Sequence, residues 1–118
     1  MECRKWLLNA LAVGGFTASL VVVMPGYTQA QNVKDIYAKE CKSCHGATGK
    51  GDGPVGKLIN PKPTDFALSL KGKSDAWIAK AIKGGGPAVG ESDVMPGYGD
   101  LSNQQIKELV DYIKKFSS

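Results

Sequence analysis

The run Cys41-Lys42-Ser43-Cys44-His45 holds the residues whose types and spacing could do chemistry. Two thiols three positions apart can each form a thioether with one vinyl group of a porphyrin, and the histidine that follows can bind its iron. C-x-x-C-H is the attachment signature of a c-type haem. The sequence therefore predicts one haem c bound covalently to Cys41 and Cys44, with His45 as an axial ligand of the iron.

A C-x-x-C pair also suits a redox dithiol or half of a zinc site. A structural zinc site needs four Cys or His ligands, and outside this run the chain offers only Cys3, in a segment that we expect to be removed. A thioredoxin-like dithiol belongs in an alternating strand and helix pattern, whereas the apolar spacing here is helical. Both alternatives stay open, and neither accounts for the histidine.

The second axial ligand must be of another type, because His45 is the only histidine of the chain. Met1 and Met24 lie in the N-terminal segment, which leaves Met95 in the Pro/Gly-rich loop 94–99. A methionine used for packing more often lies on an apolar helical stripe. We expect Met95 to be the sixth ligand, since a thioether raises the reduction potential and fills the coordination shell.

The N-terminal segment has the features of an export signal. A positively charged start precedes the largely apolar stretch 6–24, and small residues lie near Ala30. We predict a signal peptide over residues 1–30 and a single periplasmic domain over residues 31–118. The apolar stretch approaches the length of a membrane span, so an uncleaved membrane anchor is the alternative.

The charge pattern limits the classes of partner. The formal charge of +4 falls to +3 once Glu2, Arg4 and Lys5 are removed, and the remaining lysines alternate with acidic residues. This pattern lacks the clustered basic stripe of nucleic-acid binding. We expect a monomer whose lysines form an ordinary solvated surface. The alternative is that lysines near an exposed haem edge form a docking surface for an acidic redox partner.

Apolar periodicity places the C-x-x-C-H run at the end of a helix. Val33, Ile36, Tyr37 and Cys41 recur at helical spacing. The segment 46–54 that follows has four glycines and one proline, which favour a loop wrapped closely around a flat ligand. It lacks the spacing of a phosphate-binding P-loop.

The rest of the chain predicts three more helices and no strand. A short helix is expected over 65–70 and a second from the N-cap Ser74 to a stop at Gly84, followed by loop over 84–90. The last helix begins at Ser102 with capping-box spacing and ends near Phe116. Trp77 lies on a helical stripe where core packing is the default, Tyr98 could contact the haem, and Phe66 and Ile82 are expected to line the pocket.

Four short motifs give the chain a family resemblance. Cys-Lys-Ser-Cys-His-Gly, Gly-Asp-Gly-Pro, Val-Met-Pro-Gly-Tyr and Leu-Ser-Asn-Gln-Gln-Ile together resemble a small bacterial monohaem class I cytochrome c over residues 31–118. The resemblance implies an all-α class I cytochrome c fold of about four short helices around one haem, with the N- and C-terminal helices crossing. It implies the same roles for Cys41, Cys44, His45 and Met95. It also implies that the carbonyl of a proline, best matched by Pro54, accepts a hydrogen bond from the proximal imidazole.

The expected function is one-electron transfer rather than catalysis. We predict a periplasmic monohaem carrier that shuttles between a donor complex and a terminal oxidase or reductase. The first alternative is a haem enzyme or gas sensor with an open or labile sixth position. The second is a membrane-tethered cytochrome subunit of a larger respiratory complex, if the N-terminal segment is retained.

Overall fold

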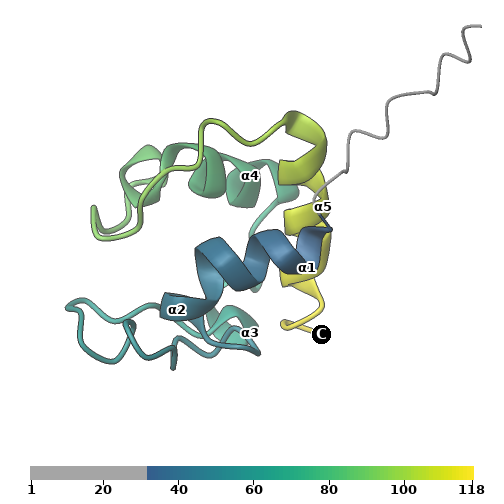
Figure 1. Ribbon diagram of the computed structural model, residues 1–118. Helices are drawn as coiled ribbons and strands as arrows, with labels where there is room; N and C mark the ends of the chain where they lie inside the picture. The colour runs from purple at the N-terminus through teal and green to yellow at the C-terminus, as the bar shows by residue number, and fades with distance from the viewer. Residues whose placement is uncertain (1–31) are drawn as a thin grey trace, which may run out of the picture.

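A computed structural model describes residues 32–118 of the chain, and Figure 1 shows how its helices are arranged. The predicted signal peptide over residues 1–30 lies outside the described residues. No helix within residues 32–118 is both long and apolar enough to cross a membrane.

The N-terminal helical segment is continuous but changes its winding. It consists of α1 (Val33–Ile36), a π-helical turn η1 (Tyr37–Cys41) and α2 (Lys42–His45). Asn32 begins it, because its side chain accepts a hydrogen bond from the amide of Lys34 at 3.1 Å. The C-x-x-C-H run therefore occupies the last turns of this segment, as the apolar periodicity predicted.

The two middle helices begin at side-chain caps. Asp65 precedes α3 (Phe66–Ser69), and Ser74 precedes α4 (Asp75–Gly84); each side chain accepts a hydrogen bond from an amide in the first turn. The predicted stop at Gly84 is confirmed. The expectation of loop over all of 84–90 is wrong in part, because η2 (Gly86–Val89) forms one 3₁₀ turn there.

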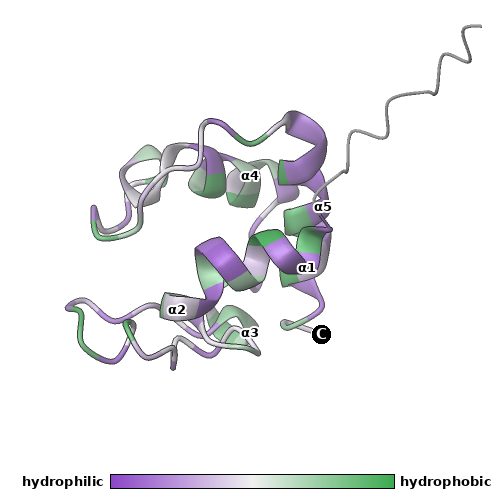
Figure 2. Cartoon of the chain, viewed as in Figure 1, coloured by the Kyte–Doolittle hydropathy of each residue, from purple (hydrophilic) through white to green (hydrophobic). Residues whose placement is uncertain are grey.

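The C-terminal helix α5 (Asn103–Lys114) begins with the predicted capping box. The Ser102 hydroxyl accepts from the Gln105 amide at 3.1 Å, and the Gln105 side chain accepts from the Ser102 amide at 2.9 Å. Its apolar stripe is buried, and Figure 2 shows hydrophobic and hydrophilic residues on different faces of the helices. The stripe consists of Ile106, Leu109, Val110 and Ile113.

The core lies where three helical segments meet. Figure 1 shows the N-terminal segment running across α5, and both α1 and α4 pack against α5. The described residues form helices and loops without a strand, so the predicted all-α fold with crossing terminal helices is confirmed. The buried cluster consists of Ile36, Tyr37, Phe66, Ile78, Ile82, Ile106, Leu109, Val110 and Ile113.

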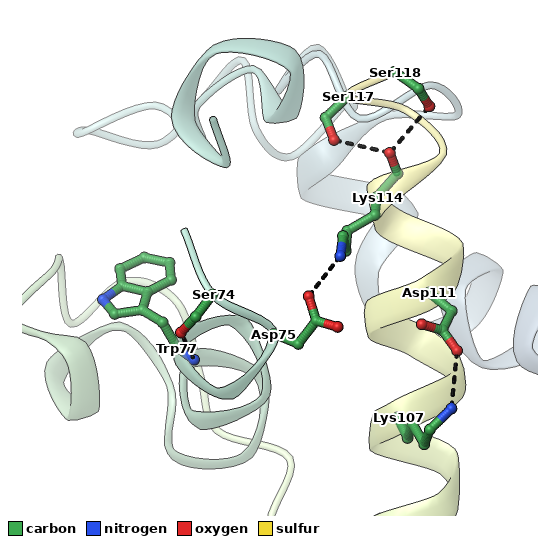
Figure 3. A network of polar contacts seen from close by, with 8 residues as sticks. All are labelled: Ser74, Asp75, Trp77, Lys107, Asp111, Lys114, Ser117 and Ser118. Carbon is green, nitrogen blue, oxygen red and sulfur yellow. Dashed lines mark hydrogen bonds and ion pairs between the residues drawn. The ribbon is translucent and has the colours of Figure 1, made fainter. Parts of the chain in front are cut away.

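Polar contacts between α4 and α5 lie on the outer surface. Figure 3 shows the Lys114 ammonium pairing with the Asp75 carboxylate at 2.6 Å, and the Lys83 ammonium donates to the Asn103 side chain at 3.0 Å. These groups are exposed, and exposed ion pairs contribute little to stability. Apolar packing therefore holds this helix pair together.

Candidate haem site

One apolar cavity collects the predicted site residues. Its volume is about 260 Å³. A wider and more open groove of about 610 Å³ lies between α4 and α5, but no cysteine, histidine or methionine lines it. The chemistry therefore belongs to the smaller cavity. Its walls include Cys41, Cys44, His45, Phe66, Leu70, Trp77, Ile78, Ala81, Ile82, Met95, Tyr98 and Ile113.

The two cysteines of the run are half-buried free thiols in the cavity wall. Burial raises the pKa of the Cys41 thiol to about 11, with smaller contributions from the charges of Glu40 and Cys44. A redox dithiol needs the opposite, a thiol whose pKa is lowered so that it reacts as a thiolate. The environment of Cys41 thus disfavours the dithiol alternative. Nowhere in 32–118 do three or more His, Cys, Asp or Glu side chains gather so that they could hold a metal ion.

The glycine-rich loop folds back beneath the cysteine run. The amide of Gly51 donates to the His45 carbonyl and that of Val55 to the Ser43 carbonyl, both at 2.9 Å. Gly53 lies so close to the run that an added Cβ would overlap the Ser43 carbonyl oxygen. Backbone bonds and close approach, rather than side-chain packing, hold this loop against the attachment helix.

His45 is placed as a ligand needs to be. Its ring stacks on Phe66 with the ring centroids 4.6 Å apart, and burial lowers the pKa of the imidazole, which favours the neutral form that binds metals. Its Nδ1 atom is buried and has no hydrogen-bond partner among the described residues.

Pro54 does not make the bond that the resemblance implied. It is exposed and does not line the cavity, and the unpartnered Nδ1 of His45 shows that its carbonyl accepts nothing from that atom in this structure. The amides on either side of Pro54 bond to the cysteine run. Pro54 therefore shapes the turn here, and its role toward the imidazole stays a prediction.

Met95 reaches the cavity on the loop between η2 and α5. The Gly86 amide donates to the Met95 carbonyl at 3.1 Å, and the Tyr98 amide donates to the Ile82 carbonyl at 2.9 Å. The loop is thus fastened to the end of α4 and to η2. The cavity brings Met95 together with Cys41, Cys44 and His45, although Met95 lies 50 positions after the end of the run.

The aromatic residues do more than the sequence indicated. Trp77 packs partly against the core as expected, but it also lines the cavity and carries the Lys73 ammonium 4.3 Å from its ring centroid. Phe66 and Ile82 line the cavity as predicted, and the stacking of Phe66 on His45 was missed. Periodicity describes one helix at a time, so nothing in the sequence signals a contact between a helix end and a distant short helix.

The Tyr98 hydroxyl also has a contact that the sequence did not reveal. It donates to the Glu40 carbonyl at 2.8 Å, directly before Cys41. A proline and glycine pattern predicts that a loop forms, but it does not say what the loop touches.

The cavity fits a covalently attached haem. It offers two free thiols on one helix end, an imidazole, a thioether and mostly apolar walls. These are the ligands and the surroundings that a c-type haem needs.

Comparisons with known proteins agree with this fit. The cytochrome c family model matches residues 30–117. The FixP subunit of the cbb3-type cytochrome c oxidase of Azorhizobium caulinodans is 33% identical over 103 residues, which cover 86% of this chain and 32% of that protein. This chain therefore spans about a third of the length of that relative.

Two solved structures share the fold. A chain of the Kuenenia stuttgartiensis reducing HAO-like protein complex matches with a TM-score of 0.59 and 29% identity, over 71% of this chain and 40% of that one. The c-type cytochrome KustC0563 matches with a TM-score of 0.57 and 24% identity, over 74% of this chain and 99% of that one.

Proposed function

Because the chain belongs to the cytochrome c family and binds a haem c through Cys41 and Cys44, we propose that it is a one-electron carrier with His45 and Met95 as axial ligands. The observation that supports this most is the single apolar cavity that gathers both thiols, the imidazole and the thioether. Bound haem c supplies a reversible one-electron couple. The proposed activity is electron transfer and not catalysis of a bond-making reaction.

The chain's own residues suit this role. Two cysteines on one helix end fix the position of the group, and His45 is held by the same helix end and by Phe66. With haem bound, Met95 would supply the second protein ligand of the iron, which would leave no open position for a substrate. Apolar walls exclude water, so the surroundings change little between the two charge states.

The distribution of charge favours acidic redox partners. Residues 42–73 contain six lysines and two aspartates, whereas residues 74–118 contain five lysines and six acidic residues. The six lysines of the first segment are exposed, and one of them, Lys62, lines the cavity together with Glu40 and Glu91. We propose that donor and acceptor proteins dock at the exposed lysines of this segment through a weak, transient contact.

The relatives suggest the setting of the electron transfer. We propose a periplasmic monomer that carries electrons from a donor complex to a terminal oxidase or reductase, with the N-terminal segment acting as an export signal. The likeness to an oxidase subunit favours one alternative, a tethered cytochrome subunit of a larger complex. Sequencing the N-terminus of the purified protein separates the two, since only the carrier begins near residue 31.

The ligation is tested by replacing Met95 with alanine in the haem-loaded protein. We expect the wild type to show the thioether-to-ferric-iron absorption band and no response to carbon monoxide. Met95→Ala should lose the band, bind carbon monoxide and have a lower reduction potential, by a fraction of the roughly 0.8 V that axial ligands span.

Leu68→Ala is the control for this experiment. Leu68 lies on α3, does not line the cavity and is 77% exposed, so its removal should leave the spectrum unchanged. A wild type that already binds carbon monoxide readily would instead support the gas sensor or haem enzyme.

A further inference from the structure

The Met95 loop is fastened firmly on one side only. Its backbone bonds at Met95 and Tyr98 join it to η2 and to the end of α4. Gly97 packs so tightly there that an added Cβ would lie 2.8 Å from the Gly84 carbonyl carbon and 2.9 Å from the Lys83 carbonyl oxygen. These contacts leave the loop without a backbone link to the helix that carries Cys41 and Cys44.

A single side chain supplies the missing link. The hydroxyl of Tyr98 donates to the Glu40 carbonyl at 2.8 Å across 58 positions of the chain. In the part of the chain that the structure describes, no other hydrogen bond joins the loop 90–101 to the segment 33–45. Glu40 directly precedes Cys41, so the bond ends beside the first attachment point.

The surroundings of Tyr98 keep this bond in place at neutral pH. The residue is partly buried and lines the cavity. Burial, the largest cause, raises the pKa of the Tyr98 phenol above its usual range. The hydroxyl therefore remains a donor, and water competes poorly for it.

We propose that Tyr98 is a positioning residue whose hydroxyl ties the Met95 loop to the attachment helix and so keeps the Met95 thioether in its axial position. This inference rests on the proposed ligation by Met95. Without the bond, the loop keeps its anchors on α4 and η2 but can move away from the attachment helix. Val94, beside Met95, is 39% exposed, so an outward movement meets little packing.

The test uses the haem-loaded Tyr98→Phe variant, which keeps the ring and removes only the hydroxyl. An external ligand such as cyanide must displace Met95 before it binds ferric iron. Loss of one partly buried neutral hydrogen bond should favour the displaced loop about fivefold. We expect cyanide to bind about fivefold faster, and the thioether-to-iron band to disappear at a correspondingly lower pH.

Tyr37→Phe is the matched control. Tyr37 also makes one hydroxyl-to-carbonyl bond, 2.7 Å long, but its acceptor is Gly46 and not a residue of the Met95 loop. A general loss of stability should accompany both variants. Only Tyr98→Phe should speed cyanide binding, a readout that a merely structural role would not move.

The outcomes separate this inference from the proposed ligation. If the wild type shows the thioether-to-iron band and Tyr98→Phe binds cyanide at an unchanged rate, the positioning role of Tyr98 is overturned and Met95 remains the ligand. A wild type without the band overturns both the role of Tyr98 and the ligation by Met95.

A second variant is used if Tyr98→Phe does not mature with haem. Gly97→Ala changes the other anchor of the same loop, because its added Cβ forces the loop away from the end of α4. Faster cyanide binding in Gly97→Ala supports the inference that the anchors of the loop keep Met95 on the iron. An unchanged rate in Gly97→Ala contradicts that inference.

Discussion

The helices and the loops of this protein are held by different forces. The helices α1, α4 and α5 bury a continuous set of aliphatic side chains, with Leu109 completely enclosed. The loops 46–64 and 90–101 contribute little to that cluster and are fixed by backbone hydrogen bonds and tyrosine hydroxyls. The difference indicates that the helices can support one another, whereas the loops depend on what lies between them.

What lies between them is the cavity. Its walls come partly from the core helices, through Ile78, Ile82 and Ile113, and partly from the loops, through Ile59 and Met95. A domain of fewer than 90 residues has few apolar contacts to spare, so a large flat haem in this cavity adds much of its buried surface. The contrast between helices and loops can therefore be tested by changing each part separately.

The largest effect is expected from removing the haem. In a haem-free Cys41→Ala/Cys44→Ala variant the cavity walls lose their common partner, so we expect a poorly folded chain with weak near-ultraviolet circular dichroism. Amide hydrogen exchange should show the loss of protection most completely in 46–64 and 90–101.

The wild-type holoprotein, measured in parallel, is the reference for this experiment. Protection of both loops at holoprotein levels in the haem-free variant would mean that the haem does not organise them.

A smaller but still severe effect is expected in the helices. Leu109→Ala removes a fully buried side chain at the crossing of the helices, and such truncations cost about 2–5 kcal/mol of unfolding free energy. Denaturant titration of the holoprotein measures this loss. Leu68→Ala, at an exposed position of α3, should change stability by less than about 0.5 kcal/mol. Equal losses in the two variants would show that α5 does not organise the core.

The same contrast explains what the sequence could predict. The helices follow from apolar periodicity and from local caps such as Ser74 and Ser102, because both signals act within a few positions. The spacing of Cys41, Cys44 and His45 and the position of Met95 predicted that these residues belong to one site, and one cavity does bring them together. Ligation by His45 and Met95 stays a prediction.

The contacts between segments could not be predicted. The stacking of Phe66 on His45 and the bond from Tyr98 to Glu40 join positions that are 21 and 58 apart, and neither pair forms a periodic pattern. The 3₁₀ turn at η2 was missed because glycine and proline are typical of loops and of single helical turns alike. The orientation of a loop at a cavity depends on contacts with distant parts of the fold. Local sequence patterns therefore do not predict it.

The smallest expected effect concerns Tyr37, a tyrosine of the helices that is bonded to the start of the first loop. Tyr37 is buried among the helices, and its hydroxyl donates to the Gly46 carbonyl, where the first loop begins. We expect Tyr37→Phe to lower the free energy of unfolding at neutral pH by about 1 kcal/mol, since one buried hydrogen bond is lost. Urea titration of the holoprotein measures this difference.

The pH dependence of that difference sharpens the comparison. Burial, with smaller contributions from Cys41, Tyr112 and Asp52, holds the pKa of the Tyr37 phenol above its usual range. A phenol whose pKa is higher in the folded state stabilises the fold fully below its unfolded pKa of about 10, and this stabilisation is lost as the pH rises further. The advantage of wild type over Tyr37→Phe should therefore shrink above about pH 10. If the difference in unfolding free energy between wild type and Tyr37→Phe stays constant from pH 7 to 11, the hydroxyl proton of Tyr37 does not hold the loop at Gly46.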